Sequence, residues 1–409
     1  MTDPLRVGVT YLPHDTGIHQ WQEFSARRMA HDLALVRAQG FGHLRVHLAW
    51  DAFMPTHRRV DRHRLRDLDA LLGVARAQGL LCELVLLAQS HGDCLQLPAY
   101  AVDRRRPRRG VRIVVGGRVV EGGPRDLWAD PLMLEAAELW LRTLLEAFGN
   151  HPALAGWDLG HDPAATLRPR RLEQMVRTIE VLAATVRRRQ DRVHLTLGAG
   201  DVFEARGVRL APLAAAVDSL GLLIDPQRLP VEGAGAAAAA AFTLALAQRL
   251  AAVEGRVPPL EVVTGLAVDD HPELPPPGVD GEPPRWDVDP LTPGEAARVT
   301  SELLGRLDEG GARGLWATSW CVGGSRALAA PPCDRLPALG RHGLAAGDGE
   351  LRAHGRVWSE LALRESAVQA PAPLAATLDA EAYYANLPDS ARDLWAAWRG
   401  DQDGASARD

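Results

Sequence analysis

The sequence predicts an α/β protein of the (β/α)₈ barrel class, and three observations carry this prediction. Apolar segments begin at Leu5, His43 and Leu81, at equal intervals along the chain. Helical patterns lie between them, and five further apolar segments follow. Short strands that alternate with helices are typical of βα units and a parallel sheet. Eight such units in the first 366 residues fit this barrel, which commonly runs from about 200 to more than 400 residues.

The helices are predicted from apolar spacing and from the residues at their ends. Both helices before the second and third strands end in the tetrapeptide RAQG, which places Gly40 and Gly79 where a left-handed C-terminal residue is favoured. Asp130 and Pro131 are typical of a helix start, and TPGE at 292–295 predicts a capping box. Apolar residues at helical spacing mark the inner faces of the first two helices: Met29, Leu33 and Val36, then Leu65, Leu68, Leu72 and Ala75.

Five more strands are expected after the third. The rival architecture is a doubly wound sheet, but no GxGxxG motif follows the first strand to favour it. The five segments are LAGWDL (154–159), VHLTLG (193–198), LGLLID (220–225), LEVVTG (260–265) and GLWATSW (314–320).

Two additions to the barrel are expected. VRIVVGGRVVEGG, at 111–123, predicts a β-hairpin that turns at Gly116 and Gly117 and is inserted after the third strand. Residues 270–290, rich in Pro, Gly and Asp, predict a long loop after the seventh strand. We expect residues 1–366 to form the barrel, and residues 367–409 to form a C-terminal extension with a docked helix and a disordered end.

Composition narrows the classes of function. A chain of 409 residues with 46% hydrophobic content and a formal net charge of −6 is expected to be globular and not a general nucleic-acid binder. Four cysteines without CxxC spacing favour thiols in a reducing compartment. No leader and no apolar stretch of membrane-spanning length is seen, so we expect a cytoplasmic protein without membrane partners. The sequence leaves a homo-oligomer open.

Active sites of such barrels lie at the C-terminal ends of the strands. Arginine, histidine, acidic and aromatic residues gather there, which is typical of a sugar site. Trp50 could instead be core, and Arg45 could only neutralise a carboxylate inside the barrel. The strand-end residues are Tyr11, His14, Arg45, His47, Trp50, Gln89, His91, Asp93, His161, Asp162, Asp201, Asp225, Thr264 and Trp320.

Several segments together resemble glycoside hydrolase family 5 and its clan A relatives, above all bacterial cellulase- or mannanase-like members. They are LRVHLAWDAFMP, SHGDCLQLPAYA, FGNHPALAGWDLGHDP, GLWATSWC and PPCDRLPALGRHGLAAGDGELRAH, and the resemblance runs from about residue 5 to 365. It implies a barrel that acts on β-linked glycans with two glutamates. One is an acid/base after an asparagine at the end of strand four, and the other is a nucleophile at the end of strand seven.

This chain departs from the family at both catalytic positions. The Asn-Glu-Pro motif is His161-Asp162-Pro163 here, and the nucleophile position falls on Thr264, with Gly265 next to it. Glu261 lies three residues earlier, roughly 10 Å back along the strand. The resemblance therefore implies a divergent member with an altered catalytic pair.

The resulting expectation is a carbohydrate-binding barrel, a catalytically impaired pseudoenzyme, in which Asp162 is the remaining candidate acid/base and Thr264 a degenerate nucleophile position. The alternative is an active O-glycosidase with Asp162 as acid and a non-standard base among Asp201, Asp225, Asp269 and Asp270. The ligand is expected to be an oligosaccharide or glycoside. The residues expected to bind it are Arg45, Trp50, His91, His161 and Trp320.

No cofactor and no metal are expected. A zinc or iron site is the alternative, because His14, His47, His91, His161 and Asp162 could converge at the barrel mouth. No HExxH motif supports it.

Overall fold

The computed structural model describes residues 4–406, except 191, 206, 232–234, 271–287, 336–339, 365–366 and 371–377. The expected loop at 270–290 lies almost entirely outside the described residues.

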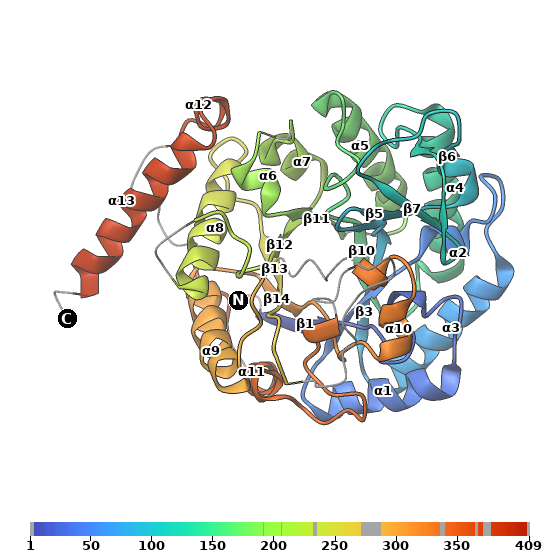
Figure 1. Ribbon diagram of the computed structural model, residues 1–409, viewed down its shortest axis with the longest axis horizontal. Coiled ribbons are helices and arrows are strands. Elements are labelled where there is room, and N and C mark those ends of the chain that lie inside the picture. Colours follow the sequence, from blue (N-terminus) through green and yellow to red (C-terminus); the bar gives the residue numbers. More distant parts are fainter. Residues whose placement is uncertain are drawn as a thin grey trace.

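Eight parallel strands close into a barrel, which confirms the predicted fold class (Figure 1). Going round the barrel, the order is β1, β14, β13, β12, β11, β10, β3 and β2. Each of the eight predicted segments forms one of these strands. Their bounds are β1 Arg6–Thr10, β2 His43–His47, β3 Leu81–Leu87, β10 Leu154–His161, β11 Val193–Gly198, β12 Ser219–Ile224, β13 Leu260–Thr264 and β14 Gly314–Ala317.

Helices surround the barrel on its outer side (Figure 1). The longer ones are α1 Ala26–Ala38, α3 Arg62–Ala77, α4 Pro131–Phe148, α5 Leu172–Arg187, α7 Leu210–Ala216, α8 Ala236–Leu250, α9 Pro293–Glu309 and α11 Ala353–Ala362. Short helices at the strand ends are η1 Gly17–His19, α2 Trp50–Phe53, α6 Gly200–Phe203, α10 Ser325–Ala329 and η3 Cys333–Arg335.

The predicted helix ends are confirmed. Gly40 and Gly79 have φ of 90° and 68°, the left-handed region that glycine adopts at low cost. Asp130 caps α4 by accepting a hydrogen bond from the N–H of Leu132. At the start of α9, Thr292 and Glu295 form the reciprocal hydrogen bonds of a capping box.

The predicted hairpin after the third strand is also confirmed, within a larger insertion. It consists of β7 Arg112–Val115 and β8 Arg118–Val120, and both glycines of its turn have positive φ (56° at Gly116 and 76° at Gly117). It extends a sheet with β4 Ser90–His91 and β5 Cys94–Gln96. The rest of the insertion contains β6 Val102–Asp103, η2 Ala99–Ala101 and β9 Gly123–Pro124.

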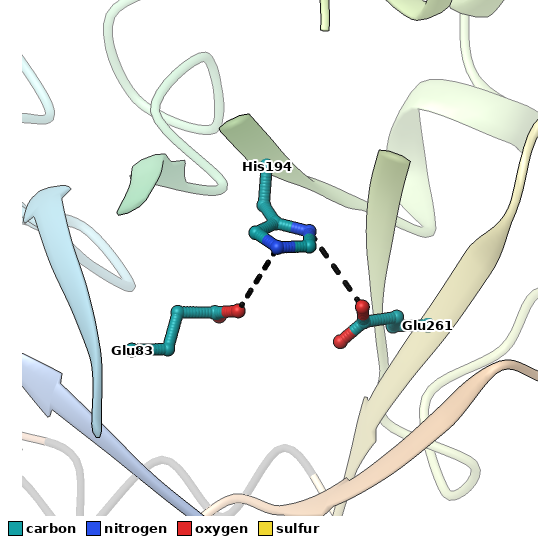
Figure 2. Close-up of side chains that lie close together, drawn as sticks. All are labelled: Glu83, His194 and Glu261. Carbon is teal, nitrogen blue, oxygen red and sulfur yellow. Dashed lines mark ion pairs between the residues drawn. The ribbon is translucent and has the colours of Figure 1, made fainter. Parts of the chain in front are cut away.

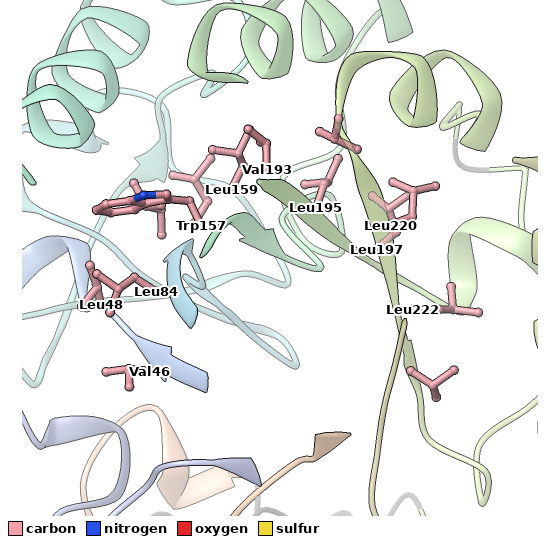
Figure 3. Close-up of a cluster of buried hydrophobic side chains, with 14 of the residues drawn as sticks. Val46, Leu48, Leu84, Trp157, Leu159, Val193, Leu195, Leu197, Leu220 and Leu222 are labelled. Carbon is pink, nitrogen blue, oxygen red and sulfur yellow. The ribbon is translucent and has the colours of Figure 1, made fainter. Parts of the chain in front are cut away.

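Apolar side chains fill the space around the barrel wall, with ten members labelled in Figure 3. Alternate residues of one strand point to opposite faces of the sheet. One set of side chains can therefore pack in this core, while the other set points into the barrel. On β2, for example, Leu44 and Val46 belong to the apolar core, while Arg45 between them pairs with charged residues of other strands.

A charged layer made by Arg6, Arg45, Glu83, Asp158, His194 and Glu261 lies in the barrel. Figure 2 shows His194 between Glu83 and Glu261, and its ring nitrogens lie 3.5 Å and 3.6 Å from their carboxylate oxygens. Glu261 also pairs with Arg6 and accepts a hydrogen bond of 2.6 Å from the Trp316 indole. Glu261 is therefore engaged near the start of β13, away from the strand end.

After the barrel, α12 Ala380–Ala385 and α13 Asp389–Ser406 contact its outer side. The rings of Phe242 on α8 and Trp395 on α13 lie 5.0 Å apart between centroids. The Tyr383 hydroxyl donates a hydrogen bond of 2.9 Å to the Val202 carbonyl. In the described part of the chain, no helix is long and apolar enough to span a bilayer.

Candidate functional site

A cavity of about 540 Å³ opens at the C-terminal ends of the barrel strands. This volume lies within the range of roughly 300–1,000 Å³ that is usual for small-molecule sites. All eight strand ends, or the residues that follow them, contribute to its wall. One lining residue from each, from the first strand to the eighth, is Leu12, His47, His91, His161, Gly198, Asp225, Gly265 and Thr318.

Three histidines from neighbouring strands meet at this cavity: His47, His91 and His161. The rings of His47 and His161 lie 4.7 Å apart between centroids. Burial lowers the pKa of His47 to about 3 and that of His91 to about 4, and the nearby Arg45 guanidinium lowers the pKa of His47 further. Burial also lowers the pKa of His161. The three imidazoles are therefore neutral at pH 7, and each can offer one donor and one acceptor.

Asp162 lies on the cavity wall directly after β10, as the sequence predicts for the fourth strand end. Its backbone has φ of 46°, which is uncommon for a residue with a side chain. The Asp162 N–H donates to the carbonyl of Thr196 on β11 at 2.9 Å. A β-carbon at Gly198 would lie 2.2 Å from an Asp162 carboxylate oxygen, so only glycine leaves room there. The carboxylate is thus held over the end of β11.

Among the described residues at the end of the seventh strand, none presents a carboxylate to the cavity. Thr264 is fully buried and is not among the lining residues, whereas Gly265 lines the wall. A β-carbon at Gly265 would lie 2.1 Å from the Thr318 hydroxyl oxygen. A larger residue at 265 therefore requires Thr318 to move.

Arg45 lies inside the barrel below the cavity and does not line it. Its guanidinium pairs with Asp158, donates to the Thr196 hydroxyl at 3.1 Å and lies 3.6 Å from Glu83. Both Arg45 and Asp158 are almost fully buried, at 1% and 0% exposure. This placement matches the alternative interpretation of Arg45, in which it neutralises interior carboxylates.

The two tryptophans that were expected to face a sugar lie in the core. Trp50 is buried on α2 and stacks on Trp140, with ring centroids 6.0 Å apart and planes within 5°. Trp320 is fully buried and meets Phe41 edge to face at 6.2 Å. Neither indole lines the cavity, and the rings among its described lining residues are the imidazoles of His47, His91, His161 and His342.

Within the described ranges, two further carboxylates line the cavity with Asp162. Asp225 was among the sequence candidates, whereas Glu204 was missed because it follows α6 and not a strand. Asp225 lies 3.2 Å from Arg228, which also lines the wall. The other candidate bases are engaged elsewhere: Asp201 is buried outside the cavity lining, and Asp269 and Asp270 pair with Arg341 and Arg352.

His342 was also missed by the sequence analysis. It lies in the loops after β14 and closes the cavity beside Asp225 and Arg228, and burial lowers its pKa. The sequence around it shows no periodic pattern that could have placed it there.

The five residues considered for a metal do not form a ligand set in the described part of the chain. His14, for example, is engaged by the Val322 carbonyl at 2.8 Å. The described residues bring metal-ligand atoms together at Glu83, His194 and Glu261, inside the barrel. Two arginines already pair with these carboxylates, so a divalent cation there would face both guanidinium groups at close range.

Among the comparisons with known proteins, the comparison with solved structures supports the barrel fold, and the sequence comparisons find no match. No protein-family model matches the sequence, and no curated protein matches it significantly. The GH5_18 protein from Streptomyces cattleya, crystallised with GlcNAc, has a TM-score of 0.71 and 20% identity over 91% of this chain and 83% of its own. A GH5_18 variant from Bifidobacterium longum in complex with Manβ1-4GlcNAc has a TM-score of 0.70 and 17% identity over 90% and 80%.

The exo-β-1,4-mannosidase Op5Man5 from Opitutaceae bacterium strain TAV5 is a third similar structure, with a TM-score of 0.69 and 20% identity over 89% of this chain. The match covers 60% of the mannosidase chain, which is therefore considerably longer. At these identities the likeness establishes the fold of this chain, a TIM barrel, and not its activity.

Proposed function

We propose that this protein is a divergent family 5-like barrel that binds a carbohydrate, an oligosaccharide or glycoside with β-linked sugars, and that it lacks the family's retaining hydrolysis. The observation that carries the proposal is the cavity wall itself. Polar groups suited to sugar hydroxyls line the cavity, and Gly265 is the described residue that lines it from the end of strand seven.

The polar groups of the cavity support carbohydrate as the ligand class. Neutral imidazoles at His47, His91 and His161 can each donate one hydrogen bond and accept another, which suits a hydroxyl that does both. Asp162 and Asp225 add carboxylates that accept from hydroxyls. Apolar side chains complete the wall against the C–H faces of a sugar. They include Leu12, Ile18, Leu223, Leu229 and Leu328.

The arrangement argues against a glycosyl-enzyme intermediate. Retaining hydrolysis needs a second carboxylate about 5 Å from the acid, on the opposite side of the scissile bond. Gly265 has no side chain, and the hydroxyl of the buried Thr264, a weak nucleophile, has no hydrogen-bond partner among the described residues that could act as its base. Asp162 is also one methylene shorter than glutamate, which sets its carboxyl back from the glycosidic oxygen.

An active inverting glycosidase is the second candidate. Inversion needs an acid and a base separated by about 6.5–9.5 Å, with water between them. Asp225 and Glu204 line the same cavity as Asp162, and this favours them over Asp201, Asp269 and Asp270 as the base. In this mechanism Asp162 would protonate the departing oxygen while the base takes a proton from water.

Calorimetry against manno-, gluco- and xylo-oligosaccharides, followed by product analysis of each mixture, tests the proposal. We expect binding without cleavage, and we expect Asp162→Asn to weaken binding about tenfold by removing a charged acceptor. Asp389→Asn, on the remote helix α13, is the matched control. Cleavage that Asp162→Asn abolishes would establish the inverting alternative. If none of the three classes of oligosaccharide gives a binding heat, carbohydrate binding is contradicted.

The cysteines agree with the proposed cytoplasmic location. Cys82, Cys94, Cys321 and Cys333 are all buried and free in the structure. Burial raises the pKa of the thiols of Cys82 and Cys333 to about 12, so these side chains are unreactive packing groups.

A further inference from the structure

A short segment after the last strand crosses one side of the cavity. It comprises residues 325–335, which include α10 and η3, and is called the strap below. Its inner side chains, Ala327, Leu328 and Cys333, line the cavity. In Figure 1 α10 is drawn in orange beside β3 in this view.

The first end of the strap is held by the loop that follows β1. Arg326 lies 2.7 Å from the carboxylate of Glu23, and α10 packs against η1. A β-carbon at Gly17 would come within 3.5 Å of Ala327, which shows how closely the two segments approach. This contact is largely exposed, so we expect it to contribute little on its own.

The second end is held by the insertion after β3. Arg112 of β7 forms a bidentate pair with Asp334, with nitrogen–oxygen distances of 2.5 Å and 2.6 Å. The Asp334 side chain is 5% exposed, so the guanidinium supplies the hydrogen bonds that this buried carboxylate needs. Arg335 lies 3.8 Å from Asp93 in the same insertion and adds a weaker contact. The insertion and the strap are thus joined across the barrel mouth.

The exposed side chains of the cavity wall lie opposite the strap. Among the described lining residues, Gly92, Glu204, Arg228 and Pro230 are exposed, and the three that carry side chains follow β11 or β12. In the circular strand order, β12 lies directly across the barrel from β2. The strap is anchored next to β1 and β3, the two neighbours of β2. In the described part of the chain, the strap therefore walls the cavity on the side of β2, and most of the exposed lining lies on the side of β12.

We propose that the strap makes this cavity a blind pocket that accepts the end of a glycan, or a short oligosaccharide, and excludes the interior of a polysaccharide chain. The inference rests on the proposed carbohydrate function. A chain bound through its interior must leave the site on both sides, and the Arg112–Asp334 pair closes one exit. Arg112 is therefore a specificity-determining residue that acts by holding the strap.

Thiol labelling tests the strap without any sugar. Cys333 is buried on the inner, cavity-facing side of the strap, so a bulky maleimide should label it slowly in the native protein, with the site identified by peptide mass mapping. Arg112→Ala leaves Asp334 buried without its bidentate partner, and we expect labelling of Cys333 at least about tenfold faster. The charge swap Arg112→Asp with Asp334→Arg should restore slow labelling. Arg392→Ala, in an exposed pair on α13, is the control.

Unchanged labelling in a folded Arg112→Ala protein would overturn the strap's role. The second part of the test measures the binding of the protein to sugars. At equal mass, the partial digest of a β-glycan polymer has more chain ends than the intact polymer. We expect the amount of bound protein to increase in proportion to the number of chain ends. Binding that follows total mass would overturn the blind pocket while leaving the proposed function intact. No binding to the polymer, its digest or free oligosaccharides would overturn both.

Discussion

Gly265 and Thr318 stand so close at the ends of the seventh and eighth strands that a β-carbon on Gly265 would lie 2.1 Å from the Thr318 hydroxyl oxygen. Real β-carbons do not approach oxygen this closely. The space beside Gly265, next to the expected nucleophile position Thr264, is therefore occupied by the Thr318 hydroxyl. A side chain at 265 requires Thr318 to move or to be replaced by a smaller residue.

Gly265→Ala should lower the free energy of unfolding by about 1–3 kcal/mol through overpacking. Thr318→Ala should recover most of this loss in the double variant, because it removes the clashing oxygen. Urea unfolding of the four proteins in this cycle measures the coupling. Gly305→Ala in α9 is the control, since a β-carbon at Gly305 meets nothing within 4 Å and alanine favours helix. Independent, additive effects at 265 and 318 would contradict the clash.

Arg45→Met should destabilise the fold by about 3–5 kcal/mol, because Asp158 and Glu83 lose their shared cation inside the barrel. Chemical denaturation measures the change. Arg392→Met breaks a pair that is largely exposed on both sides, and we expect a change of at most about 1 kcal/mol there. Equal costs for the two variants would show that Arg45 does not sustain the interior carboxylates.

The eight strands and most helix ends could be predicted because their signals are local. Apolar runs, RAQG termini and capping residues act within a few neighbours along the chain, and the barrel follows from their alternation. The Gly116-Gly117 turn is equally local, since both residues need positive φ.

The site was predicted less completely, because the position of a residue at a strand end does not determine the direction of its side chain. Neighbouring residues face opposite sides, so His47 reaches the cavity while Arg45 lies inside the barrel. One step of register likewise separates buried Thr264 from Gly265 on the wall. The Arg112–Asp334 contact joins residues 222 positions apart, and no local sequence pattern predicts it.

Acid should destabilise the protein through the histidines of the cavity. The pKa of His47 in the folded state is about 3, below its ordinary value near 6.5, so the unfolded chain takes up this proton first as pH falls. The contribution of neutral His47 is complete above pH 6.5 and declines as pH falls towards 3. Its slope is at most about 1.4 kcal/mol per pH unit, and less where cavity water reaches the ring.

His47→Gln should therefore flatten the dependence of the free energy of unfolding on pH between 7 and 4. Guanidinium unfolding at several pH values, for the variant and the unmodified protein, gives the difference directly. His63→Gln is the control, because His63 lies at the exposed start of α3 and its replacement should leave the slope unchanged. Parallel pH profiles for His47→Gln and the unmodified protein would mean that His47 is not kept neutral by folding.

We propose that residues 367–409 form an extension held on the barrel mainly by the Phe242–Trp395 contact. Trp395 is 6% exposed and its ring lies 5.0 Å from that of Phe242, so Trp395→Ala should remove about 3 kcal/mol or more from the docking of α13. Hydrogen exchange of the α13 amides should then accelerate at least about 100-fold, while β-strand amides keep their protection. Asp393→Ala, on the exposed face of the same helix, serves as the control. Equal acceleration in α13 and in the barrel strands would show instead that the extension and the barrel unfold as one unit.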